Sequence, residues 1–111
     1  MNTPDAAPGR RVHSAESAQR ELAQRALLSH WSVSEDGLSL AAEWRFPGFA
    51  QAFGFMAEMA LVSERLNHHP EWFNVYNRVQ VRLSTHDAKG LTDLDLAWAE
   101  SAARAAARHG V

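Results

Sequence analysis

Apolar and polar positions alternate with two different periods along the chain. After Ser14, which can cap a helix, Ala18, Leu22 and Ala26 recur at helical spacing and predict a helix that ends near residue 28. Residues 31–33 favour a short strand, and an acidic turn with a glycine follows. From residue 38 to 46 apolar side chains occupy every second position, which is typical of a half-buried strand. The first third of the chain therefore predicts a helix followed by a β-hairpin.

A long helix is predicted from Phe49 to Leu66, directly after Pro47 and Gly48. Its large apolar side chains form two stripes on opposite sides: Phe49, Phe53, Met56 and Ala60 on one, and Phe55, Met59, Val62 and Leu66 on the other. A sheet buries only one side of a helix. We expect the first stripe to cover the sheet and the second to form a ridge that another subunit buries, giving a homodimer or homotetramer through residues 49–66.

A second hairpin is predicted by strands at 72–75 and 78–83 around a turn at Tyr76 and Asn77. Thr92 then caps a last helix, with Asp95 at the third helical position in a variant of the capping box. The order helix, hairpin, helix, hairpin, helix predicts an α+β fold, with a four-stranded antiparallel sheet and three helices on one face.

Two segments are expected in the 111 residues. Residues 1–13, which carry Pro and Gly and almost no large apolar side chain, predict a flexible tail, and residues 14–111 predict a single domain. The 11 basic and 13 acidic residues give a net charge of −2 without clusters, which argues against a nucleic-acid partner. There is no cysteine and no apolar run long enough for a bilayer. A cytoplasmic protein without a membrane partner is the expectation.

The chemistry-bearing residues gather between Glu64 and Asp87. His68 and His69 precede Pro70, which forces His69 out of the helical region and ends the long helix near Asn67. Both imidazoles then sit at a corner between helix and strand. The second hairpin brings His86 back beside this corner. Histidine titrates closest to neutral pH, so three imidazoles in one place favour acid–base chemistry.

These residues carry a family resemblance. Phe53-Gly54-Phe55-Met56, then Glu64-x-x-x-His68-His69-Pro70 with Trp72, and finally Ser84-Thr85-His86-Asp87 resemble the pterin-4a-carbinolamine dehydratases, over about residues 22–98. The resemblance implies a lyase that dehydrates 4a-hydroxytetrahydrobiopterin to quinonoid dihydropterin and supports tetrahydrobiopterin recycling. It implies no metal and no organic cofactor. The substrate-binding residues that it implies are Glu64, Asn67, His68, His69, Trp72, Ser84, Thr85, His86 and Asp87.

The same resemblance implies that His68, His69 and His86 are catalytic. His68 and His86 are the expected general acids at the 4a-hydroxyl, one for each stereoisomer, while His69 binds substrate and assists as a base. Asn67 departs from the family pattern, because many members carry Asp at this position. The other three histidines, His13, His30 and His109, are interpreted as structural.

Three alternatives stay open. The three histidines are compatible with a zinc site. The apolar ridge on the long helix would equally suit a non-enzymatic dimerisation cofactor, a role that animal relatives have. A pterin-binding role in molybdopterin metabolism is the third alternative.

Overall fold

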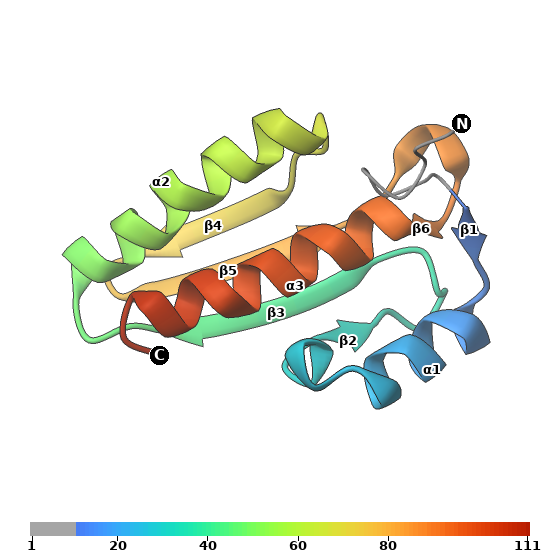
Figure 1. Cartoon of the computed structure of the whole chain (residues 1–111), viewed down its shortest axis with the longest axis horizontal. Helices are drawn as coiled ribbons and strands as arrows, with labels where there is room; N and C mark the ends of the chain where they lie inside the picture. Colours follow the sequence, from blue (N-terminus) through green and yellow to red (C-terminus); the bar gives the residue numbers. More distant parts are fainter. Residues whose placement is uncertain (1–10) are drawn as a thin grey trace, which may run out of the picture.

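The structure, a computed structural model, describes residues 11–111. Four antiparallel strands form the main sheet in the order β2-β3-β5-β4, and β1 and β6 form a small second sheet. Figure 1 shows α2 and α3 lying side by side across the main sheet, with α1 beside its β2 edge. The elements are β1 (Val12–His13), α1 (Ala15–Gln24), η2 (Ala26–Leu28), β2 (Ser32–Val33), β3 (Leu40–Arg45), α2 (Phe49–Leu66), β4 (Glu71–Val75), β5 (Arg78–Leu83), η3 (His86–Ala88), β6 (Leu91–Thr92) and α3 (Asp93–Arg108).

The central strands follow the predicted alternation. Val79, Val81 and Leu83 of β5 are buried beneath the helices, whereas Gln80 and Arg82 are exposed on the opposite face. The α+β class, the order of helices and strands and the antiparallel sheet are confirmed. Leucines and aromatic side chains from every layer share one core, at whose centre the Trp98 indole is completely buried.

Helix α2 has the predicted bounds, but the prediction of its buried side was wrong. Phe55 and Met59 are completely buried, whereas Phe53 is 57% exposed. The rings of Trp44 and Phe46 lie 5.2 and 5.1 Å from the ring of Phe55, and they provide the aromatic surface that receives it. The two stripes carry similar apolar side chains, so periodicity alone cannot tell which stripe is buried. The position of the Trp44 and Phe46 rings decides that the Phe55 stripe faces the core.

The exposed side of α2 is therefore the other stripe. Phe49 and Phe53 lie on it with their rings 5.9 Å apart, and Leu61, outside both predicted stripes, is 74% exposed. Val62 and Leu66 are partly buried against the core. Any subunit that covers this helix meets Phe49, Phe53 and Leu61, which we call the α2 ridge.

The beginning of the domain also differs from the prediction. Val12 and His13, assigned to the flexible tail, form β1, which pairs with β6. The His13 ring is buried, with Nδ1 2.8 Å from the Ser17 hydroxyl and Nε2 2.7 Å from a carboxylate oxygen of Asp93. This polar clamp, rather than apolar area, holds the segment. The rest of the predicted tail, residues 1–10, lies outside the described residues.

Smaller differences concern the first hairpin. Ser14 caps α1 as predicted, but the helix ends at Gln24 and η2 continues to residue 28. Leu38, expected in the strand, is exposed before β3 begins. Among residues 11–111, no helix has the length and apolar character needed to cross a bilayer.

Candidate active site

The corner between α2 and β4 positions two of the histidines. Asn67 follows the helix in the left-handed conformation, with φ 51° and ψ 47°, and its N–H donates back to carbonyls of the last turn. Asparagine adopts this conformation more readily than most residues, which gives Asn67 a structural reason to be there. The turn sends His68 inwards and leaves His69 exposed. Adjacent residues thus have different environments.

His68 is anchored by a buried carboxylate. Its Nε2 lies 2.6 Å from Oδ1 of Asp95, in the first turn of α3, and the two residues are 7% and 0% exposed. A carboxylate only accepts hydrogen bonds, so Nε2 carries the proton and Nδ1 is the nitrogen left for other partners. Asp95 therefore sets both the orientation and the tautomer of this ring.

Two threonines complete the surroundings of Asp95. Its Oδ2 accepts the Thr92 backbone N–H at 2.9 Å and the Thr85 hydroxyl at 2.7 Å. The Thr92 hydroxyl lies 2.9 Å from the Thr85 hydroxyl and accepts the Leu94 N–H. Since each hydroxyl has one proton, the Thr92 hydroxyl donates to Thr85, and Thr85 donates to Asp95. The Thr85 hydroxyl and the Thr92 N–H thus bond directly to the carboxylate that holds His68, and the Thr92 hydroxyl is linked to it through Thr85.

His69 has a different, exposed partner. Its Nε2 lies 2.6 Å from Oε2 of Glu64, in the last turn of α2, and both side chains are more than half exposed. In contrast to the buried pair, this contact is surrounded by solvent and is free to rearrange when a ligand binds.

The three histidines His68, His69 and His86 line a pocket of about 350 Å³, which we call the histidine pocket. Seven of the predicted substrate-binding residues line it, together with Glu71 and Arg82: Asn67, His68, His69, Ser84, Thr85, His86 and Asp87. Glu64 lies beside it through its contact with His69. The pocket thus brings together the three predicted catalytic histidines from the α2–β4 corner and from η3.

Trp72, like Glu64, is a predicted binding residue that does not line this pocket. Its indole packs edge-on against Trp98, with ring centroids 6.2 Å apart, and belongs to the rim of the core. Alternation along β4 turns it towards the helices, next to the exposed Glu71 and Phe73. Within residues 11–111 no group of three His, Cys, Asp or Glu side chains is arranged to hold a metal ion, so the zinc alternative lacks a ligand set there.

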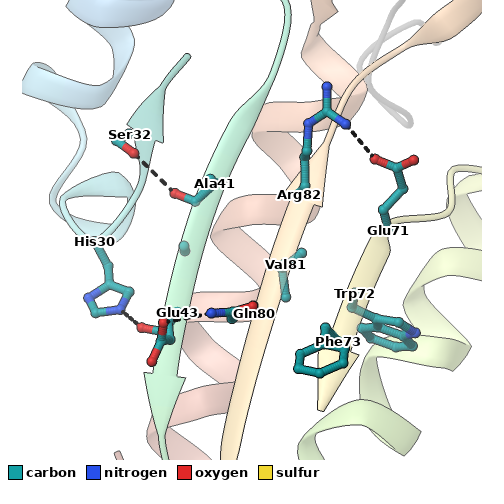
Figure 2. A pocket seen from close by; sticks show the side chains of 11 residues that line it. His30, Ser32, Ala41, Glu43, Glu71, Trp72, Phe73, Gln80, Val81 and Arg82 are labelled. Carbon is teal, nitrogen blue, oxygen red and sulfur yellow. Dashed lines mark hydrogen bonds and ion pairs between the residues drawn. The ribbon is translucent and has the colours of Figure 1, made fainter. Parts of the chain in front are cut away.

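A second hollow, of about 700 Å³, lies on the face of the sheet away from the helices. Figure 2 shows Phe73 beside it and the Glu71–Arg82 ion pair at one end. Glu71 and Arg82 line both hollows. We call this second hollow the sheet-face groove.

Asp95 was not among the residues proposed for the site. From sequence it was interpreted only as a capping residue, and that role is confirmed, because its side chain accepts the Thr92 N–H. One signal was present: an Asp stands where a capping box usually has Glu or Gln. The shorter side chain keeps the carboxylate close to the helix end, where its second oxygen reaches His68.

An antiparallel sheet covered by helices, with three imidazoles and a buried carboxylate at one end, defines a small α+β protein equipped for proton transfer. The chain belongs to the pterin 4 alpha carbinolamine dehydratase family, whose model matches residues 12–105. This establishes the family that the sequence motifs indicated.

Relatives from several bacteria support the assignment. A protein of Rhizobium rhizogenes, named as a candidate pterin-4-alpha-carbinolamine dehydratase, is 56% identical over 70% of this chain and 77% of its own. One from Rhizobium leguminosarum bv. trifolii with the same name is 52% identical over 80% of this chain and 88% of its own.

Two solved structures are similar in fold. A Brucella melitensis protein, described as a transcriptional coactivator/pterin dehydratase, has a TM-score of 0.79 and 36% identity, covering 86% of this chain and 99% of that one. A pterin dehydratase-like protein, identified as a RuBisCO assembly factor in the alpha-carboxysome, has a TM-score of 0.60 and 21% identity, covering 68% and 88%. The second likeness concerns the fold alone.

Proposed function

We propose that the protein is a hydro-lyase that dehydrates 4a-hydroxytetrahydrobiopterin to quinonoid dihydropterin and so supports tetrahydrobiopterin recycling. The observation that carries the proposal is the buried Asp95–His68 hydrogen bond at the wall of a pocket that also contains His69 and His86. Family membership supports the substrate class. The reaction loses the 4a-hydroxyl as water and the N5 proton, and the electrons of the N–H bond form the N5=C4a double bond.

In this mechanism His68 and His86 supply the proton to the leaving hydroxyl, one for each stereoisomer. Hydroxide is a poor leaving group, so its protonation is the main requirement, and a positioned acid contributes about 10²–10⁴-fold. Asp95 keeps the His68 proton on Nε2, so a protonated His68 donates from Nδ1 and returns to the neutral ring. His69, with Glu64 beside it, binds substrate and accepts the N5 proton. Side chains of the protein thus supply both the acid and the base that the reaction needs.

The remaining pocket residues are proposed to bind the planar ring. Asn67, Ser84 and Asp87 line the pocket and offer the alternating donors and acceptors that an amino-pyrimidinone edge needs. Thr85 acts through Asp95, because its hydroxyl proton is already committed to the carboxylate. Trp72 supports β4 from the rim of the core and lines the sheet-face groove instead of this pocket.

A stopped-flow measurement of 4a-carbinolamine decay, with and without the protein, tests the proposal. Protein should accelerate the decay, with a maximum near neutral pH and a decline on both sides, since one step needs a protonated imidazole and the other a neutral base. Decay at the spontaneous rate would refute the dehydratase activity. Acceleration without any change across the imidazole titration range would refute the histidine mechanism.

The α2 ridge supports a second, compatible role in association. Phe49, Phe53 and Leu61 are large apolar side chains exposed on one helix, and we propose that a second copy covers them in a homodimer or homotetramer. A dimerisation cofactor would use the same surface for another protein. Selective capture of a protein partner by a chain that lacks pterin turnover would favour that alternative over the enzyme.

A further inference from the structure

The Glu71–Arg82 ion pair joins the histidine pocket to the sheet-face groove. The two residues are Cα partners in the β4–β5 pairing, and a guanidinium nitrogen of Arg82 lies 2.9 Å from Oε1 of Glu71. Both side chains are 58% exposed, and both hollows include them in their walls. A ligand in the histidine pocket that carries a substituent on this side meets the pair first and then the groove.

The sizes of the two hollows suggest how a ligand divides between them. Sites for small molecules usually measure about 300–1,000 Å³, and the histidine pocket, at about 350 Å³, lies near the lower limit. This volume accommodates a bicyclic ring beside the histidines. The groove adds about 700 Å³ directly beyond the ion pair. A substituent that leaves the ring towards Arg82 thus has a continuous path onto the sheet.

The side chains along this path favour a neutral, hydroxyl-bearing chain. The ion pair places donors of Arg82 beside acceptors of Glu71, which matches neighbouring hydroxyl groups. Further along, the Gln80 amide donates to a Glu43 carboxylate oxygen at 3.1 Å, and Phe73 offers an exposed ring for the C–H side of such a chain. Figure 2 shows these groups on three neighbouring strands, β3, β5 and β4.

Charge argues against a phosphorylated substituent. Glu43 and Glu71 line the groove, and Arg82 is the one guanidinium among its lining residues. Arg82 is moreover paired with Glu71. A phosphate would need clustered basic groups, which the groove lining does not provide.

From these observations we infer that Arg82, Glu71 and Phe73 determine specificity for pterins with a neutral polyhydroxylated substituent, which runs from the histidine pocket into the sheet-face groove. This inference rests on the proposed dehydratase function. It assigns the three residues to substrate selection and leaves proton transfer to the histidines.

Steady-state kinetics with two 4a-hydroxytetrahydropterins test the inference, one with a methyl group and one with a trihydroxypropyl group at the same ring position. The wild-type KM should be roughly tenfold or more lower for the trihydroxypropyl pterin, because hydrogen bonds to charged groups are at stake. Arg82→Ala and Phe73→Ala should reduce that preference with little change in kcat. Arg82→Lys, which keeps the charge but not the planar fork, should retain part of it.

Arg104→Ala is the matched control, since Arg104 is exposed on α3 and lines neither hollow, and it should preserve the preference. Equal KM values for the two pterins in an active wild-type enzyme would overturn the inference and leave the dehydratase function intact. A lower KM for the phosphate ester of the trihydroxypropyl pterin would also overturn it. Failure to turn over either pterin would refute the dehydratase function itself, and this inference with it.

Discussion

Replacing Asp95 by Asn separates the chemical role of this residue from its shape. Asp95 accepts from three donors, of which the Thr92 backbone N–H cannot rotate away. The amide introduced by Asp95→Asn must therefore direct its oxygen at Thr92 and its NH₂ group at His68. Nε2 of His68 then has to accept instead of donate, so its proton moves to Nδ1. The substitution reverses the tautomer with almost no change in volume.

The expected loss of activity follows from this reversal. A wrong tautomer removes most of the benefit of a positioned acid, so the rate of dehydration should fall roughly 10²–10⁴-fold for the isomer that His68 serves. Folding should suffer less. The two hydrogen bonds from the threonines survive in neutral form and the one with His68 reverses its direction, which predicts a destabilisation of about 1–3 kcal/mol.

Stopped-flow kinetics and thermal melting of the same preparations measure both effects. Asp93→Asn is the matched control: it makes the same charge change in the same helical turn, but Asp93 pairs with His13 and Arg11 instead of a pocket residue. It should lower stability and preserve the rate. Asp95→Asn combined with His68→Ala should be no slower than His68→Ala alone, because Asp95 acts through that ring. Wild-type turnover by folded Asp95→Asn protein would refute the reasoning.

Three further outcomes are expected. His86→Ala should slow dehydration of one 4a-stereoisomer more than the other, and equal loss for both in chiral assays would contradict two separate acids. Phe53→Glu should yield smaller species in light scattering, because burying a large side chain is worth roughly 1.5–3 kcal/mol and a charge in the interface reverses that gain; an unchanged mass would exclude this surface from the oligomer. A hydrogen bond from Arg108 lowers the pKa of Glu58 below its ordinary value of 4.5, so its carboxylate stabilises the fold above that pH and loses the effect as pH falls through the depressed pKa. Glu58→Gln should thus cost about 0.2–1 kcal/mol at pH 7 and flatten the acid side of a melting-temperature profile, whereas an unaltered profile would contradict the assignment.

The sequence by itself determined the local structure and the identity of most pocket residues. Alternation along residues 78–83 and the Ser14 and Thr92 caps predicted strands and helix starts that the structure confirms, because these signals act within a few residues of the chain. The motif around His68 and His86 indicated the family because a family is recognised by residue types and their spacing. Both are present in the sequence itself, whatever the residues contact in the fold.

Only the tertiary structure decided which side of each element faces the core and which distant groups meet. Phe53 and Phe55 are equally apolar, and their exposure depends on where Trp44 and Phe46 place their rings. Asp95 lies 27 residues after His68. Its position in the capping box explains the contact of only one of its two carboxylate oxygens. The other oxygen acquires its role because α3 begins beside the end of α2, a packing arrangement that local patterns do not encode.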